Sequence, residues 1–163
     1  MKSFKLLFCA LFLMALGSCG SASTPEVAVQ KFFDQLLIIN KEYNVVIEKR
    51  RNKEVYDTKR MEKLGQNVEN EYENLFCYNG VPSNDDNKKS VSRFVEKEYA
   101  FNLGKAEYCK IISTTMSEDQ NLAVVKFEYK EGSVHQYLVR NVDGNWMIEV
   151  NSRAEMKKIL ESK

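Results

Sequence analysis

Apolar residues recur at helical spacing in the first part of the chain. Between residues 25 and 39 they are three or four positions apart, which predicts an amphipathic helix with one buried face. Thr24, Pro25 and Glu26 stand where this helix starts, and they are typical of an N-cap, a first helical position and an acidic first turn. The stripe consists of Val29, Phe32, Phe33, Leu36 and Leu37.

A second helical pattern covers residues 41–76, a stretch that contains no proline. We expect either one long helix or two helices with a break near residues 50–57, where charged residues are dense. A loop rich in Asn, Asp and Lys follows over residues 79–89, and a third helix is predicted over residues 90–102. The clearest part of the second stripe consists of Met61, Leu64, Val68, Tyr72, Leu75 and Phe76.

The pattern changes to alternation of apolar and polar residues after residue 104, which predicts strands. Short polar turns separate the alternating segments, and Asp143-Gly144 is a strong hairpin signal. Because such short links join neighbouring strands, we expect an antiparallel meander, followed by a short helix over residues 152–161. The predicted strands cover residues 108–115, 122–130, 134–142 and 145–150.

The alternation also assigns the two faces of this sheet. Lys126 and Glu128 share one face, which we expect to be solvated, and the apolar face must be covered by the helices that precede it. The predicted fold is therefore α+β, with N-terminal helices packed on a curved four-stranded antiparallel sheet. The apolar face consists of Ala123, Val125, Phe127, Tyr129, Trp146, Ile148 and Val150.

The first nineteen residues resemble the export signal of a bacterial lipoprotein. Lys2 and Lys5 precede an uncharged apolar run over residues 6–16, which is too short to remain as a membrane-spanning helix. Leu16-Gly17-Ser18-Cys19 then resembles the lipobox, in which an aliphatic residue and two small residues precede the lipidated cysteine. The resemblance implies cleavage before Cys19 and acylation of Cys19, palmitate included; the alternative is an ordinary signal followed by a chance cysteine.

Cleavage at this position defines the organisation of the mature chain. Gly20 follows Cys19 and no acidic cluster is near, so the resemblance implies the periplasmic face of the outer membrane. Loss of Lys2 and Lys5 lowers Lys+Arg from 24 to 22 against 23 Asp+Glu, and such a near-neutral domain has no electrostatic basis for binding nucleic acid. The predicted parts are a signal peptide (1–18), a lipidated tether (19–24), a folded domain (25–151) and a C-terminal helix or tail (152–163).

Two cysteines remain in the predicted mature domain, Cys77 and Cys109. In an oxidising compartment such a pair often forms a disulfide, and the alternative is two separate buried thiols. The sequence contains no CxxC motif and no Cys/His cluster, so we predict neither a metal site nor a cofactor.

The order of helices, meander and terminal Asp-Gly-Asn-Trp resembles the nuclear-transport-factor-2-like cone, also described as a cystatin-like fold. The closest resemblance is to a lipoprotein domain of unknown function in that superfamily, although the charged segment near residues 41–60 is longer than expected there. The similar stretches are residues 24–33, 108–113, 117–119, 123–129 and 143–146.

In the enzymes of that superfamily, polar acid–base groups lie inside the cone. His135 is the sole histidine and shares strand parity with Tyr137, but no matching inward acid is evident, so we assign no catalytic residue. Aromatic residues inside a cone either line a ligand pocket or fill the core. The candidate pocket residues are Phe127, Tyr129, His135, Tyr137 and Trp146.

Three functions remain open on this basis. The first is a non-catalytic binding or interaction module, held at a membrane by its lipid, whose partner is a small ligand or an envelope protein. The second is a small enzyme that uses His135 with a tyrosine in the cone interior. The third is an envelope immunity or inhibitor lipoprotein, which is supported only by the small size of the chain and its predicted lipid anchor.

Overall fold

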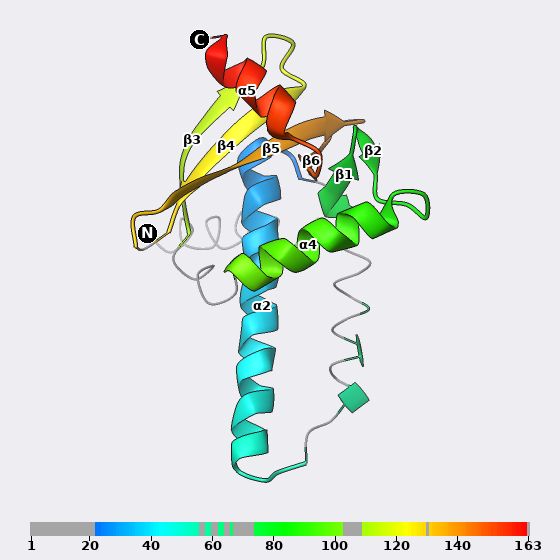
Figure 1. The fold of residues 1–163 in the computed structure, drawn as a ribbon, viewed down its shortest axis with the longest axis vertical. Coiled ribbons are helices and arrows are strands. Elements are labelled where there is room, and N and C mark those ends of the chain that lie inside the picture. The colour runs from blue at the N-terminus through cyan, green and yellow to red at the C-terminus, as the bar shows by residue number, and fades with distance from the viewer. Residues whose placement is uncertain are drawn as a thin grey trace, which may run out of the picture.

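The computed structural model describes residues 22–55, 58–59, 62–63, 66, 74–102, 109–129 and 131–162. Among these residues are the three helices and six strands labelled in Figure 1, and the strands form one sheet. The helices are α2 (Pro25–Arg51), α4 (Lys88–Asn102) and α5 (Arg153–Glu161). The strands are β1 (Phe76–Tyr78), β2 (Val81–Pro82), β3 (Lys110–Met116), β4 (Leu122–Glu128), β5 (Val134–Val142) and β6 (Asn145–Glu149).

The sheet is six-stranded and mixed, with the order β2-β1-β6-β5-β4-β3. Strands β3 to β6 form the predicted antiparallel meander, but β1 adds to β6 in parallel and pairs with β2 in an antiparallel hairpin. The predicted four-stranded antiparallel sheet is therefore wrong, although the fold remains α+β. The physical reason is that β1 joins the sheet through β6, which is about seventy residues away in the chain, and such long-range pairing leaves no local signal in the sequence.

Strand β1 lies at the end of the segment predicted to be helical. Phe76, which closes the predicted helical stripe, pairs with Ile148 of β6 and is completely buried. The loop predicted over residues 79–89 likewise contains β2, whose Val81 pairs with Tyr78. Met61, Leu64, Val68 and Tyr72 of the same stripe lie outside the described residues, as do residues 1–21 with Cys19.

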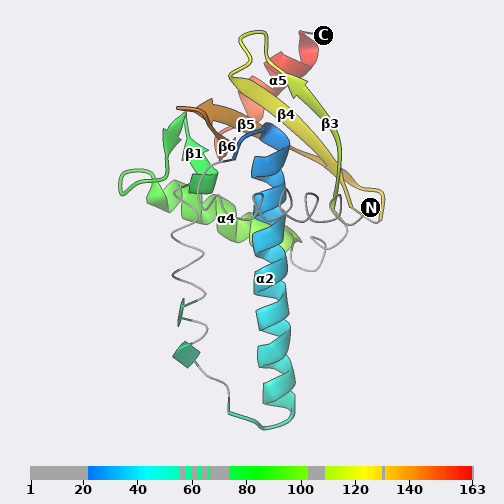
Figure 2. The same cartoon turned by 180° about the vertical axis from the view of Figure 1, so that it is seen from behind.

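Helix α2 starts as the sequence predicts and then runs further. The Thr24 hydroxyl accepts a hydrogen bond from the Val27 amide, which caps the helix, and Pro25 occupies the first turn. With 27 residues the helix is about 40 Å long, at 1.5 Å per residue. Its C-terminal half projects beyond the rest of the domain in both views (Figures 1 and 2). Its buried residues lie in the first half: Pro25, Ala28, Val29, Phe32, Phe33 and Leu36.

The main core lies between this half of α2, helix α4 and one face of the sheet. Phe32 packs edge-on against Phe76 at 5.5 Å and against Tyr137 at 5.9 Å between ring centroids. Phe94 of α4 contacts the same two rings. Burial of such aromatic side chains, each ~150–250 Å², is the largest source of stability in this layer.

The opposite face of the sheet is also partly covered, which corrects the expectation of a solvated face. Helix α5 crosses it (Figure 1), and Ile159 packs there against Val124 of β4 and Leu138 of β5. These two strand residues are completely buried. The prediction failed because apolar residues also occupy this face, next to Lys126 and Glu128, at the end of the strands that α5 reaches.

Candidate functional site

A cavity of about 310 Å³ lies where the C-terminal part of α4 meets the ends of β4 and β5. Its size is at the lower end of the range for ligand pockets, ~300–1,000 Å³. We call it the aromatic pocket. It is lined by Glu98, Phe101, Phe127, Tyr129, His135, Gln136 and Tyr137.

The strand register explains why aromatic residues gather there. Phe127 of β4 is directly opposite His135 of β5, so both side chains lie on the same face of the sheet. Tyr129 and Tyr137 follow two positions later along each strand and therefore share this face. Phe127 and Tyr129 are only 1% and 2% exposed, so they form the floor of the aromatic pocket and belong to the core as well.

The rings around the pocket contact one another at mutual tilts. The centroids of Phe127 and Tyr137 are 4.9 Å apart, and His135 lies 5.2 Å from Tyr129. Phe101, at the rim, is 47% exposed and lies 5.0 Å from His135. These distances are typical of aromatic clusters, so the walls are close-packed and the rim opens to solvent.

Helix α4 contributes Glu98 and Phe101 to the lining of the pocket. These residues are three positions apart, which places them on one face of the helix. The Tyr137 hydroxyl donates a hydrogen bond to Oε2 of Glu98, so a carboxylate is joined to the aromatic wall. Burial, with smaller electrostatic contributions from Cys109, Glu98 and Glu131, raises the pKa of Tyr129, which remains a neutral phenol.

The sequence predicted four of the residues that line this pocket but did not predict Glu98. Phe127, Tyr129, His135 and Tyr137 line the cavity, whereas Trp146 does not. The Trp146 side chain is 7% exposed and its amide donates to the Ala22 carbonyl, at the start of the described chain. Glu98 was overlooked because an acid on a charged helix resembles a solvated residue; its i, i+3 spacing from Phe101 was the one available signal.

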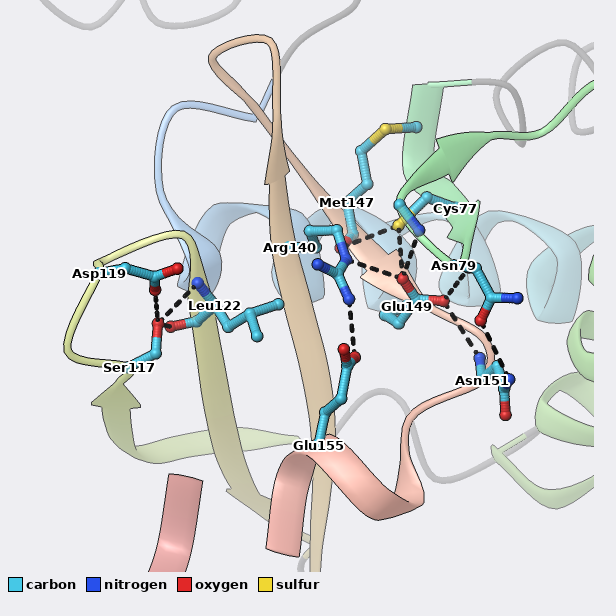
Figure 3. A network of polar contacts seen from close by, with 11 residues as sticks. Cys77, Asn79, Ser117, Asp119, Leu122, Arg140, Met147, Glu149, Asn151 and Glu155 are labelled. Carbon is cyan, nitrogen blue, oxygen red and sulfur yellow. Dashed lines mark hydrogen bonds and ion pairs between the residues drawn. The ribbon is translucent and has the colours of Figure 1, made fainter. Parts of the chain in front are cut away.

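A second polar cluster lies on the other face of the sheet, at β1, β5 and β6 (Figure 3). The Glu149 carboxylate is the one fully buried charge among the described residues. It accepts hydrogen bonds from the amides of Asn79 at 2.7 Å and Gly80 at 2.9 Å, and from Nε of Arg140 at 2.9 Å. Arg140 also binds Glu155 of α5 at 2.7 Å. The cluster is saturated by protein groups, so its role is to join β1, the β1–β2 turn and α5 to the meander.

Of the two alternatives that the sequence leaves open for Cys77 and Cys109, a disulfide or separate thiols, this structure contains two free thiols. Cys77 is buried with Sγ 3.6 Å from Oε2 of Glu149, and burial followed by the Glu149 charge raises its pKa. Burial also raises the pKa of Cys109, to about 12. Thiols of this kind are poor nucleophiles and poor metal ligands at neutral pH.

Two further findings on the described ranges concern metal binding and membrane insertion. No group of three His, Cys, Asp or Glu residues there is arranged to hold a metal ion. None of the helices in those ranges combines the length and apolarity needed to cross a bilayer.

Comparison with known proteins identifies no family for this domain. No protein-family model and no curated protein matches the sequence, and no solved structure matches the fold. The class that can be stated is an α+β domain with a mixed sheet and an aromatic pocket that contains one carboxylate.

Proposed function

We propose that this protein is a lipid-anchored, non-catalytic binding module of the cell envelope, which holds a small ligand in its aromatic pocket. The observation that carries the proposal is the pocket itself. It joins an apolar floor to a few convergent polar groups, the combination that small-ligand sites use for affinity and orientation.

The anchoring part of the proposal is supported by the sequence of residues 1–19. An apolar run of suitable length and the Leu16-Gly17-Ser18-Cys19 motif favour acylation at Cys19, and two or more acyl chains hold a protein stably at a bilayer. The test is a Cys19→Ser variant, followed by fractionation and by mass measurement of the N-terminus. We expect an unprocessed, unacylated chain; normal processing with retention in the envelope would remove this part.

The binding part can be tested by filling the pocket. In the His135→Trp variant an indole would occupy the cavity, whereas Val134→Trp places the same group on a neighbouring side chain that is 56% exposed and outside the pocket. Native mass spectra of the protein isolated from envelopes should show a bound small molecule in the wild type and in Val134→Trp. The His135→Trp variant should have lost it. A wild type without any bound mass, or equal binding by both variants, contradicts the proposal.

A second candidate is acid–base catalysis in the same cavity. It is favoured by one observation, that Glu98, Tyr137 and His135 line one pocket and that two of them are hydrogen-bonded. An enzyme would change the mass of the bound molecule during incubation, and His135→Ala would abolish that change. A ligand recovered unchanged supports the binding module.

A further inference from the structure

We infer that the short chain between acylated Cys19 and Ala22 holds one face of the domain, at the β5–β6 turn, against the lipid bilayer. This inference rests on the proposed function, because it takes acylation of Cys19 as given. Three observations carry it: the fixed position of Ala22, the number of residues between Ala22 and Cys19, and the exposed groups around Ala22.

Ala22 belongs to the predicted tether, but in the structure it is part of the folded domain. It is 3% exposed and packs in the main core. Its amide donates a hydrogen bond to Oδ1 of Asn145, and its carbonyl accepts one from the Trp146 amide at 3.0 Å. Thr24 then caps α2, whose start lies beside β6 in both views (Figures 1 and 2). The chain is therefore fixed to the sheet from Ala22 onward.

The chain between this fixed point and the lipid is short. Cys19 and Ala22 are three residues apart in the sequence. An extended chain spans at most about 3.3–3.6 Å per residue, so their Cα atoms lie within about 11 Å of each other. Acyl chains on Cys19 enter the bilayer directly from this residue, which keeps it at the level of the lipid headgroups. Ala22 can therefore lie no further than this from the headgroups, however the domain is tilted.

Exposed polar groups around Ala22 form the proposed contact with the bilayer. Nδ2 of Asn145 donates a hydrogen bond to the Asn74 carbonyl at 3.1 Å, so the segment before β1 meets the β5–β6 turn beside Ala22. Asn74, Asp143 and Gly144 are exposed. Asp143 is the one charged residue of this group, so the acyl chains hold the surface at the bilayer without help from anionic lipids. We call Asn74, Asp143, Gly144 and Asn145 the anchor face.

Two exposed positions lie far from the anchor face and provide controls. Val134 is 56% exposed and stands at the other end of β5, nine residues before Asp143, which corresponds to about 30 Å along the strand. Asn52 caps the far end of α2, about 40 Å from Thr24. The distances of Val134 and Asn52 from the bilayer depend on the tilt of the domain, whereas the short chain restricts that of Asp143.

The test measures how close each position lies to lipid headgroups. The acylated chain is isolated from envelopes, labelled with bimane at an introduced cysteine, and placed in phosphatidylcholine vesicles that contain a lipid with a nitroxide headgroup, a short-range quencher. We expect bimane at Asp143→Cys to be quenched about threefold more strongly than at Val134→Cys or Asn52→Cys. Asn74→Cys is a second label site on the anchor face and should match Asp143→Cys. Wild-type protein treated in the same way corrects for its native thiols.

A longer tether separates the reach of the chain from any affinity of the anchor face for lipid. A Gly/Ser insertion of about ten residues after Gly20 adds about 30 Å of extended chain and leaves both the lipobox and Ala22 unchanged. We expect acylation and the urea denaturation midpoint to stay the same. The quenching at Asp143→Cys should fall about threefold, to the level at Val134→Cys.

Two results would overturn the inference while the proposed function survives. One is quenching on the anchor face that is no stronger than quenching at Val134→Cys and Asn52→Cys in a chain whose mass includes the acyl groups. The other is unchanged quenching at Asp143→Cys after the insertion, because the short chain would then not be the cause. Absence of acyl mass on Cys19 would remove the anchoring part of the proposed function, and this inference with it.

Discussion

Arg140 and Glu149 form an ion pair across the β5–β6 hairpin, with Nε of Arg140 2.9 Å from Oε2 of a carboxylate that has no exposure to solvent. The two residues share the face of the sheet that α5 covers (Figure 3). Glu149 also accepts hydrogen bonds from the amides of Asn79 and Gly80. Its side chain therefore joins β6 to the β1–β2 turn, which is about seventy positions away in the chain. Such a pair specifies how β1 adds to the meander, because a shifted register would leave a buried charge without partners.

Removal of the guanidinium should be strongly destabilising for this reason. We expect Arg140→Met to lower the free energy of unfolding by about 3–5 kcal/mol, the range for breaking a buried ion pair. The matched control is Glu155→Gln, whose carboxylate is 40% exposed and should contribute no more than about 1 kcal/mol. Urea denaturation measures both. Equal effects of the two substitutions would show that Glu149 does not depend on Arg140.

Two glycines in the β1–β2 and β5–β6 turns provide a second test of the same cluster. Gly80 and Gly144 have φ values of +78° and +85°, so alanine at either position is strained by about 1–2 kcal/mol. A Cβ at Gly144 meets nothing within 4 Å, whereas a Cβ at Gly80 lies 3.2 Å from Cδ of Arg140. A Cβ at Gly80 requires the Arg140 side chain to shift by a few tenths of an ångström, which disturbs its ion pair with Glu149, so we expect Gly80→Ala to be the more destabilising of the two in urea denaturation. The reverse order would contradict this account.

The sequence predicts the meander well because its information is local. Alternation places Phe127 and His135 on one face, and a short turn puts them opposite each other, so four of the five candidate pocket residues line one cavity. Trp146 shares that face but lies on β6, beyond β5 from the pocket. Alternation predicts the face of the sheet on which a side chain lies but not how far it is from the pocket. Trp146 was therefore included among the candidate pocket residues.

The strand β1 could not be predicted in the same way. Its three residues continue a helical stripe, and a segment this short has no alternation of its own. What stabilises it is the parallel pairing with β6 and the Glu149 contacts, both of which are long-range. Glu98 and Glu149 were missed for a related reason, since the sequence does not distinguish an acid that points into the domain from one in solvent.

Packing of α2 on the sheet predicts that alanine substitution lowers stability by very different amounts at two positions of this helix. Phe32 is completely buried and contacts the rings of Phe76 and Tyr137, so we expect Phe32→Ala to cost about 3–5 kcal/mol. Ile38 lies at the middle of α2 and is 52% exposed, so Ile38→Ala should change stability by no more than about 0.5 kcal/mol. Thermal or urea unfolding measures both. Similar losses would mean that Ile38 is packed as firmly as Phe32.

Thiol reactivity should depend on pH in a way that an ordinary cysteine does not show. The thiolate is the reactive form, and burial raises the pKa of Cys109 from 9.0 to about 12. Because each pH unit below the pKa lowers the thiolate fraction tenfold, alkylation of Cys109 by iodoacetamide at pH 8 should be about a thousandfold slower than for an unperturbed thiol. Its rate should still rise tenfold per unit between pH 9 and 10, where an unperturbed thiol begins to level off.

Peptide mapping by mass spectrometry measures this rate at Cys77 and Cys109 separately. Cys77 is completely buried and its pKa is also raised, so it should react more slowly than the half-buried Cys109. In urea without reductant both should react rapidly, which controls for the reagent. A plateau of the Cys109 rate near pH 9 would contradict the effect of burial. Failure of both residues to react in urea until a reductant is added would instead demonstrate a disulfide between them, which requires rearrangement of the structure described above.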